Sequence, residues 1–361
     1  MKIFNKNEWK KVKLGDVCDI LDSKRIPISE EKRIKGEYPY YGANGIQGYI
    51  NDYIFDEELV LLAEDGGNFG SKTKPIAYKI SGKTWVNNHA HVLKVKDEII
   101  STDFLLYSLM FYDVTRLITG TTRKKLTRAG MEKITIYIPT LSIQNKITDY
   151  LNKIENFISF REHQLSFLKE LNKSLFTKFN KNGVEKQLND VADIIMGQSP
   201  LSQSYNKDKK GLPFYQGKTE FSDIYIKEAT VYCNSPIKVV EENDILMSVR
   251  APVGDVNIAT QKSCIGRGLA SIKPKKIDYL YLFYLLKEQK SKIEKIGVGS
   301  TFKAINKNNI STLKISIVEK DKQNKIRNYL SSIEKLKFEI EKSIEVAQNL
   351  YDSLISKYFD N

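Results

Sequence analysis

A few short stretches of the chain contain residue types that enzymes use in catalysis. Residues 77–84 fit a loose form of the phosphate-binding Walker A pattern, with Ala77 in the first glycine position and Gly82-Lys83-Thr84 at its end. Such a loop needs a helix directly after it, because the N-terminal amide groups of that helix face the phosphate. Residues 85–89 instead have the β-branched and aromatic composition of a strand. We therefore interpret Ser81-Gly82 as a hairpin turn and not as part of a nucleotide-binding loop.

Carboxylates and histidines also occur at spacings that suggest metal chemistry. Asp278, Glu288 and Lys290 follow the D…E-x-K order of a nuclease site. Such a site needs a hairpin of strands to bring both carboxylates onto one metal ion, whereas these residues fall on a predicted amphipathic helix. His89 and His91 share one face of a predicted strand, and the third histidine lies far away on a long helix. We therefore predict neither a metal site nor a histidine-based catalytic centre.

The signatures of a methyltransferase are missing as well. The sequence contains neither a glycine-rich cofactor loop after a strand nor an Asn/Asp-Pro-Pro-aromatic catalytic tetrapeptide. The sequence therefore predicts a chain that has no catalytic activity and binds no cofactor or metal ion of its own.

Basic and amide side chains in predicted loops suit a different chemistry, the recognition of DNA. The chain has 361 residues, a net charge of +13 and a pI near 9.2, which favours a polyanionic partner. Arg and Lys suit guanine edges and phosphates, and Asn and Gln suit adenine. The candidate DNA-binding residues are Lys24, Arg25, Lys72, Lys74, Asn87, Asn88, Arg123 and Lys124 in the first half and Lys218, Arg250, Arg267 and Lys303 in the second. Each of them alone fits a solvated surface charge better, but together, on loops that differ between the halves, they favour DNA contact.

Two long helices, one in each half of the chain, are predicted to position these loops. Apolar residues recur at alternating steps of four and three from Ile147 to Phe179, which is the a/d pattern of a coiled coil. The same series recurs 179 positions later, from Ile326 to Tyr358. The weak positions of the pattern are Arg161, Asn172 and Lys337. A helix of about 39 residues is about 58 Å long.

The rest of the chain repeats in the same way. Leu14-Gly-Asp-Val recurs as Leu188-Asn-Asp-Val, and both halves contain a buried-strand pattern, at 59–63 and at 245–249, followed by an aromatic helix. The predicted fold class is therefore α+β, with globular domains at 1–140 and 181–319 that share a scaffold but differ in their loops. The long helices at 141–180 and 320–361 are expected to pair antiparallel as a coiled coil in a pseudo-two-fold arrangement, because parallel pairing would crowd both domains at one end.

The cysteines and the hydropathy of the chain indicate in which cellular compartment it is expected. Cys18, Cys233 and Cys264 lie far apart and form no C-x-x-C pair, which fits a reducing cytoplasm. No apolar run approaches the length of a membrane helix, and the N-terminus has no signal-peptide core. We therefore expect a cytoplasmic protein without a membrane partner.

The duplicated layout resembles a specificity subunit of a type I restriction–modification system across nearly the whole chain. The resemblance is carried by the repeated Leu-x-Asp-Val motif and the Gln-Asn-Lys-Ile start of both long helices, and by motifs at 196–200, 247–254 and 265–269. It implies two target recognition domains, each of which reads one half of a bipartite asymmetric DNA site. It also places Gln198, Arg250 and Arg267 in segments that lie near DNA. The first half departs from the pattern, because Glu64-Asp65 stands where the second half has Arg250.

The resemblance also implies partners. The paired helices would set the gap between the half-sites and dock two modification subunits, which bind S-adenosylmethionine and methylate adenine. Restriction subunits, which use ATP and Mg²⁺, would join that core. One alternative is the specificity subunit of a related system whose methylase and nuclease are fused in one partner. Another is a non-catalytic coiled-coil adaptor with two protein-binding heads, for which DNA binding with a steep salt dependence is not expected.

Overall fold

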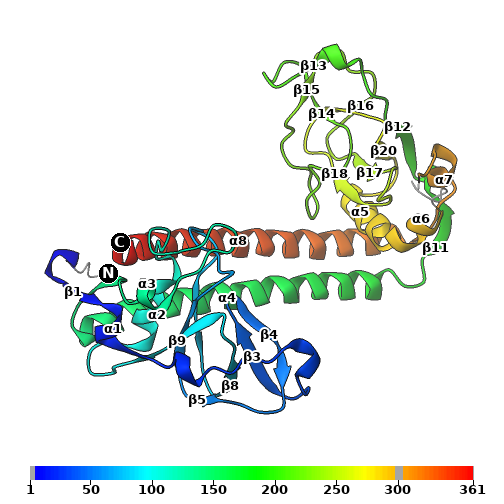
Figure 1. The fold of residues 1–361 in the computed structure, drawn as a ribbon. Helices are drawn as coiled ribbons and strands as arrows, with labels where there is room; N and C mark the ends of the chain where they lie inside the picture. The colour runs from blue at the N-terminus through cyan, green and yellow to red at the C-terminus, as the bar shows by residue number, and fades with distance from the viewer. Residues whose placement is uncertain (1–4, 297–303, 361) are drawn as a thin grey trace. The chain divides into compact units, whose positions relative to one another are not determined.

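The protein folds into two compact units (Figure 1). The structure is a computed structural model that describes residues 5–296 and 304–360. Unit 1 consists of Met1–His163 and Glu341–Asn361, and unit 2 consists of Gln164–Ile340. Each unit therefore combines a globular part with one half of each of two long helices, α4 (Leu141–Phe179) and α8 (Lys320–Phe359). No helix within the described residues has the length and apolar character needed to cross a membrane.

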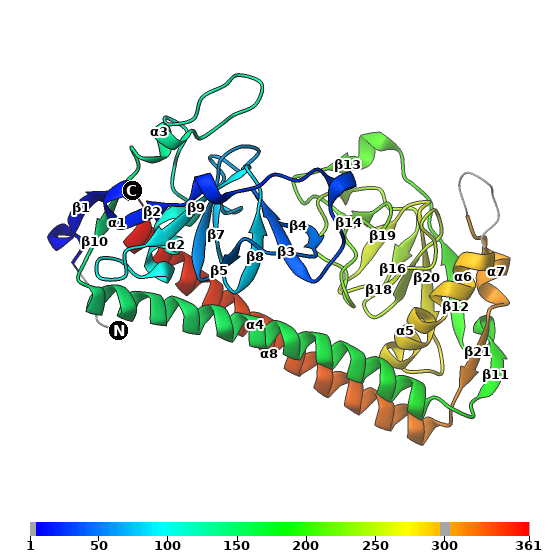
Figure 2. The same cartoon turned by 60° about the horizontal axis from the view of Figure 1, so that its bottom comes forward.

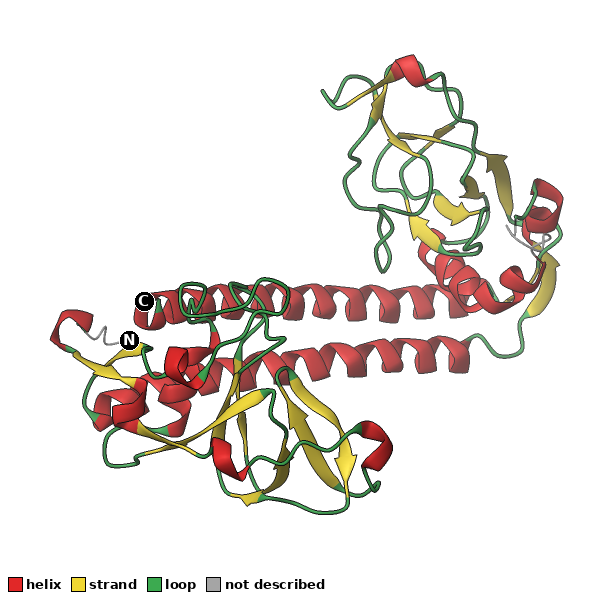
Figure 3. Cartoon of the chain, viewed as in Figure 1, coloured by secondary structure: helices red, strands yellow, loops and turns green. Residues whose placement is uncertain are grey.

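Unit 1 contains two four-stranded sheets, with the strand orders β2-β9-β6-β7 and β4-β3-β8-β5. Figure 3 shows the strands in yellow and the helices in red. A two-stranded sheet of β1 and β10 leads into α4. The strands are β1 (Lys10–Lys13), β2 (Cys18–Ile20), β3 (Tyr38–Gly42), β4 (Gly45–Ile50), β5 (Phe55–Asp56), β6 (Leu59–Ala63), β7 (Ala77–Ile80), β8 (Lys83–Val86), β9 (Ala90–Val95) and β10 (Thr135–Ile138). The short helices are η1 (Lys6–Glu8), α1 (Leu14–Val17), η2 (Asp22–Lys24), η3 (Glu30–Lys32), α2 (Thr102–Met110) and α3 (Arg128–Met131).

Strand β6 divides the core of unit 1 into two layers. All five of its residues are buried, as the continuous apolar run predicts. Val60 and Leu62 point into the core that α2 and the long helices complete. Leu59 and Leu61 point to the other face, into a core that the second sheet covers. Alternate side chains of one strand thereby fix the sheet between the helices and the second sheet.

Unit 2 repeats this scaffold with its own loops. Its sheets have the orders β12-β20-β17-β18 and β13-β15-β14-β19-β16, and β11 pairs with β21. The strands are β11 (Val184–Gln187), β12 (Ala192–Met196), β13 (Tyr205–Asn206), β14 (Leu212–Tyr215), β15 (Tyr232–Cys233), β16 (Val239–Val240), β17 (Ile245–Ser248), β18 (Val256–Ile258), β19 (Ser263–Ile265), β20 (Leu269–Pro274) and β21 (Lys314–Ile317). The short helices are η4 (Leu188–Asp190), η5 (Ser202–Ser204), α5 (Tyr279–Glu288), α6 (Lys290–Ile296) and α7 (Lys307–Ser311).

The pairing registers of the two units agree, which confirms the internal repeat. Val60 of β6 pairs with Leu93 of β9, and Ile245 of β17 pairs with Ile272 of β20 at the equivalent place. The units differ where β4 forms a hairpin with β3 in unit 1, because an irregular loop follows β14 in unit 2. The predicted α+β class and the predicted divergence of the loops are both confirmed.

The long helices begin and end where the heptad pattern predicts, and they run antiparallel within each unit (Figure 2). In unit 1, Glu155 of α4 lies beside Tyr351 of α8. In unit 2, Asn172 lies beside Glu334, while Phe179, further along α4, stacks on Tyr329, which comes earlier in α8. Residue numbers therefore increase along α4 as they decrease along the neighbouring stretch of α8, which is the arrangement of antiparallel helices.

One end of the predicted seam is wrong. Phe179 is 37% exposed, whereas Phe176, which the pattern leaves out, is 2% exposed. Phe176 packs on Tyr281 and Tyr284 of α5, so the face of α4 that carries Phe176 meets the globular part of unit 2, while the more exposed Phe179 stacks on Tyr329 of α8.

The predicted hairpin at Ser81-Gly82 is also wrong. Strand β7 pairs with β6, but β8 pairs with β3 and β5 in the other sheet. The segment therefore crosses between sheets, and Gly82 allows the crossing with a φ of 68°. A strand and not a helix follows it, so the rejection of a Walker A loop is confirmed.

Asp278 caps the N-terminus of α5, as its predicted helical setting requires.

A glutamate at the same place in each unit joins the globular part to the long helices. In unit 1, Glu155 lies 3.1 Å from the hydroxyl of Tyr107 in α2 and 2.6 Å from that of Tyr351 in α8. Burial, followed by the adjacent carboxylate, raises the pKa of Tyr107 above its ordinary value. In unit 2, 179 positions later, Glu334 accepts from Tyr284 of α5 at 2.8 Å and from Asn172 of α4 at 3.2 Å.

Replacement of these glutamates should destabilise the protein unequally. Glu155→Ala should cost about 1–2 kcal/mol, because it removes charged acceptors from two tyrosine hydroxyls. Glu334→Ala should cost more, about 2–3 kcal/mol, because Glu334 is less exposed and also pairs with the buried Lys337. The measurement is chemical unfolding of each variant, with Asn156→Ala as the control because that neighbour of Glu155 is exposed. Equal losses in both glutamate variants would contradict this account.

Candidate nucleic-acid interface

The predicted DNA-binding residues of unit 2 meet at one end of the sheet that contains β12, β20 and β17. The amide of Gln198 donates to Ile265 O at 3.1 Å, and that of Val249 donates to Gly268 O at 2.9 Å. These bonds bring the loop after β12, the loop after β17 and the turn before β20 together. Gln198, Arg250 and Arg267 lie on these three segments, and all three are exposed.

Glycines allow the three segments of unit 2 to touch. A Cβ on Gly266 would lie 2.1 Å from Gln216 Oε1, and one on Gly197 would lie 2.1 Å from Gly266 O. A side chain at position 197 would therefore push the backbones apart, whereas one at position 266 would displace the side chain of Gln216. Sequence reasoning missed Gln216, an exposed amide whose Oε1 accepts from Ser199 Oγ at 3.0 Å. The signal was present, because Gln216 opens a loop that differs between the halves.

One further residue predicted for unit 2, Lys218, makes its contacts elsewhere. Lys218 binds Asp255 at 2.5 Å, and Lys290 binds the same carboxyl at 2.5 Å. Burial alone would raise the pKa of Asp255, but hydrogen bonds from the two lysines outweigh it and hold that pKa below its usual range. Lys218 is thus engaged within the protein, and Lys303 lies outside the described residues.

The same end of the sheet in unit 1 carries different side chains at matching positions. The repeat places Lys24 where unit 2 has Gln198, Asn88 where it has Arg267, and Asp65 where it has Arg250. Lys24 and Asn88 are exposed, as contact with DNA requires. The two units therefore share their backbone scaffold but present different side chains at this end of the sheet.

Two predicted contact residues of unit 1 are held inside the protein. Arg25 Nη1 donates to Glu64 Oε2 at 2.6 Å and to Ala90 O at 2.7 Å. Asn87 is buried, and its Nδ2 donates to Gln47 Oε1 at 3.0 Å. Both side chains support the loops from within, and direct contact with DNA would require them to leave these partners.

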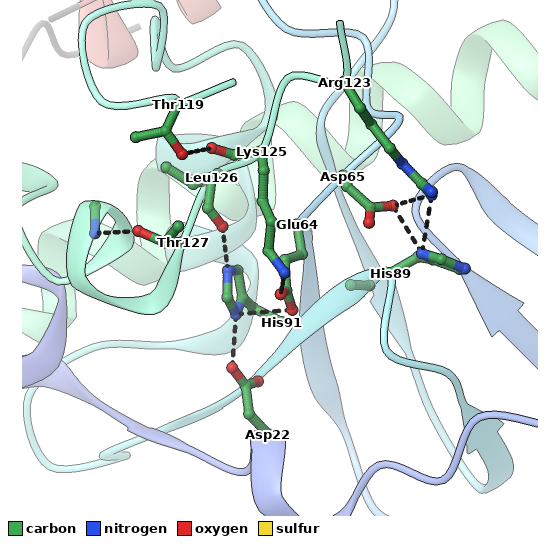
Figure 4. A network of polar contacts seen from close by, with 12 residues as sticks. Asp22, Glu64, Asp65, His89, His91, Thr119, Arg123, Lys125, Leu126 and Thr127 are labelled. Carbon is green, nitrogen blue, oxygen red and sulfur yellow. Dashed lines mark hydrogen bonds and ion pairs between the residues drawn. The ribbon is translucent and has the colours of Figure 1, made fainter. Parts of the chain in front are cut away.

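Arg25 belongs to a charge network that also contains Asp22, Glu64 and His91, and Figure 4 shows these last three residues. His91 is fully buried, with Nδ1 2.6 Å from Asp22 Oδ2 and Nε2 2.8 Å from Leu126 O. A carboxylate and a carbonyl oxygen are both acceptors, so each ring nitrogen of His91 faces an acceptor. The contact of His91 with Leu126 O holds residue 126 beside strand β9.

Asp22, Glu64 and His91 also form the kind of cluster that binds a metal ion, since their ligand atoms lie within 4.8 Å of one another. The charge of the carboxylates is already balanced, however, because Arg25 and Lys125 contact Glu64 at 2.6 and 2.8 Å. Burial alone would raise the pKa of Glu64, but these hydrogen bonds lower it. These ion pairs hold the carboxylate of Glu64 to Arg25 and Lys125 within the protein.

Two of the remaining candidates of unit 1, Arg123 and Lys124, line a groove. Its volume is about 510 Å³, and its walls are residues 66–71 and 122–124. Arg123 and Lys124 stand on one wall, and Lys72 and Lys74 follow the other wall along the chain and are exposed. Arg123 also binds Asp65 at 2.9 Å. The groove therefore collects basic side chains around a wall rich in glycine.

Comparison with known proteins identifies the family. The sequence model of the type I restriction modification DNA specificity domain matches residues 6–170 and again residues 180–347. A protein of Methanocaldococcus jannaschii described as a type I restriction enzyme MjaX specificity subunit is 35% identical over 72% of this chain and 69% of its own length. A type I restriction enzyme specificity subunit of Haemophilus influenzae, S.HindORF215P, is 29% identical over 94% of this chain and 91% of its own.

Solved structures show the same fold. The S subunit of a type I restriction–modification system from M. genitalium has a TM-score of 0.64 at 16% identity, covering 99% of this chain and 98% of its own. A structure from work on complex assembly and conformational transition of the type I R-M system has a TM-score of 0.61 at 24% identity, covering 97% of both chains. With both halves matched and the fold shared, the chain belongs to the family of type I restriction–modification DNA specificity subunits.

Proposed function

We propose that this chain selects the DNA sequence for a type I restriction–modification complex, with each unit reading one half of a bipartite asymmetric target. One observation carries the proposal. The same scaffold occurs twice, and the matching positions at one end of its sheet hold different polar side chains. Because base recognition depends on the donors and acceptors that a loop presents, two scaffolds with different loops should read two different sequences.

The long helices offer a surface for partner subunits. In heptad terms, Glu155 and Glu334 occupy e positions, and they contact α2 and α5 of the globular parts. The g and c positions lie on the opposite side of an antiparallel pair. In unit 1 these positions hold Phe157, Phe160, Val346 and Leu350, all largely exposed. We call these four residues the unit 1 patch.

An equivalent patch occurs in unit 2. It contains Leu336 and Phe167, which stand 179 positions from Phe157 and Val346 of the unit 1 patch, together with the half-buried Leu171. We call these three residues the unit 2 patch. Exposed apolar patches on a helix pair are typical of protein interfaces. Because the patch is duplicated, the chain should bind two modification subunits, one on each patch.

The reactions then belong to the partners. In this proposal the modification subunits bind S-adenosylmethionine and methylate adenine, and the restriction subunits use ATP and Mg²⁺. This chain supplies sequence recognition, and the helices set the distance between the half-sites. The absence of a methyltransferase signature in the sequence supports this division of roles.

The purified chain given S-adenosylmethionine and DNA should therefore show no methylation, whereas addition of the modification subunits should give methylation at one bipartite motif. Binding of this complex to a duplex with that motif should fall roughly 10³-fold or more between about 50 and 200 mM salt, because several phosphates are neutralised. The control is a duplex with one half-site scrambled. Methylation by the chain alone, or binding that ignores salt, would contradict the proposal.

A further inference from the structure

The loop at residues 119–125 of unit 1 holds Arg123 close to its tip. Thr119 and Lys125 close the base of the loop, since the amide of each donates to the carbonyl of the other at 2.8 Å. Gly120 makes the turn possible, because its φ is 91° and a Cβ there would lie 2.3 Å from Arg123 O. The loop is therefore shaped before a ligand arrives, which reduces the entropic cost of binding through Arg123.

A carboxylate beneath Arg123 holds its guanidinium (Figure 4). Asp65 Oδ1 accepts from Arg123 Nη2 at 2.9 Å and lies 2.7 Å from His89 Nδ1. Because that oxygen only accepts, His89 Nδ1 carries a hydrogen and donates it. The 3.4 Å between Arg123 Nη2 and His89 Nδ1 is then the separation of two donors that share one acceptor. Asp65 itself is fixed, since it forms a backbone bridge with Lys125.

This arrangement differs from the surroundings of Arg25 and Arg128. The side chain of Arg25 is only 12% exposed and contacts Asp22 and Glu64. Arg128 pairs with Glu132 one turn along the chain, where both side chains are exposed and the pair is of little energetic value. The side chain of Arg123 is 66% exposed, while that of Asp65 beneath it is 13% exposed. The bond to Asp65 uses one of the five N–H groups of the guanidinium, and the side chain of Arg123 remains largely exposed.

We propose that Arg123 reads a guanine in the half-site bound by unit 1, with Asp65 and His89 as positioning residues. The inference rests on the proposed function, in which unit 1 binds DNA. Guanine presents N7 and O6 as adjacent acceptors in the major groove, and a guanidinium binds both at once. A fixed orientation serves such a paired contact, whereas phosphates are well served by mobile lysines, which Lys72, Lys74 and Lys124 supply nearby.

Unit 2 supports the importance of this place in the fold. The bridge of Asp65 with Lys125 in unit 1 corresponds to a bridge of Arg250 with Ala304 in unit 2. In unit 1 the arginine comes from the loop and the acid from the strand end, whereas in unit 2 the strand end itself supplies the arginine. Each unit thus presents a guanidinium beside the same backbone bridge, from different segments of the chain.

The test uses the full chain with its modification subunits and short duplexes that contain the methylation motif mapped for the native complex. Each guanine of the motif is replaced in turn by 7-deazaguanine, which lacks N7. Replacement of the guanine that Arg123 contacts, in the half-site bound by unit 1, should weaken binding by the native complex roughly 10- to 100-fold. The Arg123→Ala complex should bind the natural duplex weaker by a similar factor and should lose nothing more on that replacement. Arg128→Ala, an exposed arginine of the same unit, is the matched control and should bind as the native complex does.

Two further variants separate base reading from charge. Arg123→Lys keeps the positive charge but lacks the planar guanidinium that can donate two parallel hydrogen bonds. This variant should therefore lose discrimination at the guanine as Arg123→Ala does. Asp65→Asn should weaken binding severalfold and leave the preferred base unchanged, as expected of a positioning residue. Equal weakening of Arg123→Ala on every sequence, with a shallower salt dependence, would mean a phosphate contact and would overturn the inference while the proposed function stands. A native complex that prefers no DNA sequence would overturn both.

Discussion

Exchange of residues 181–319 for the equivalent segment of a relative should change one half of the recognised DNA sequence and leave the other half intact. The segment contains the exposed polar residues that meet at the end of the unit 2 sheet, Gln198, Arg250 and Arg267. It also contains both strands of the β11–β21 pair, so no strand ladder is cut. The expected result is a complete change of bases on one side of the gap, measured by mapping methylated sites with the modification subunits present.

The exchange should fold because the joint between the segment and the helices is local to unit 2. Phe176, Ile326 and Leu330 of the long helices belong to the core that the segment completes. A donor segment with apolar side chains of similar volume facing these three residues should cost less than about 1.5 kcal/mol. The reciprocal exchange of residues 1–140 is the matched control and should change the opposite half-site. A chimera that alters both halves would show that the units do not read independently.

The helices could be predicted closely from the sequence because their signal is local. A heptad series repeats every turn, and α4 and α8 end close to the predicted bounds. The error at Phe176 and Phe179 has a different cause. Periodicity shows which residues share a face, but it does not show whether that face meets the partner helix or the globular part of the unit.

Strand partners were harder to predict, because they depend on contacts distant in sequence. The Ser81-Gly82 signal for a turn is real, and Gly82 adopts a positive φ. The strands on either side nevertheless pair in different sheets, which no local turn signal reveals. Strand positions follow from composition, but register and sheet membership follow from the tertiary fold.

Basic residues could be found from the sequence, but their roles could not. Arg25 and Arg123 look alike in the sequence. In the structure, however, Arg25 forms an ion pair with Glu64, whereas Arg123 is exposed on its loop. Arg25 pairs with Asp22, which also contacts His91, 69 positions away. No local sequence pattern predicts that two such distant residues come together. Solvent exposure and the contacts already made separate a supporting arginine from one that is free to bind DNA.

Charged substitutions in one helix patch should remove one modification subunit and spare the other. Phe160→Glu combined with Val346→Glu places two carboxylates in the unit 1 patch, and both native residues are largely exposed, so the fold should not suffer. An apolar side chain buried in an interface contributes about 1.5–3 kcal/mol. Loss of two such contacts should weaken that site at least about 100-fold. The expected complex, measured by mass at micromolar concentration, contains one modification subunit in place of two.

Phe167→Glu with Leu336→Glu should do the same at the unit 2 patch, and the four substitutions together should leave the chain without modification subunits. Phe338→Glu is the matched control, because Phe338 is equally exposed but lies at a b position on the other side of α8. Its complex should keep both subunits. If either double variant lost both subunits at once, the two sites would be coupled, and if neither variant lost any, the partners would dock elsewhere. A single loss from each double variant is the outcome that two equivalent patches, built from a duplicated helix, require.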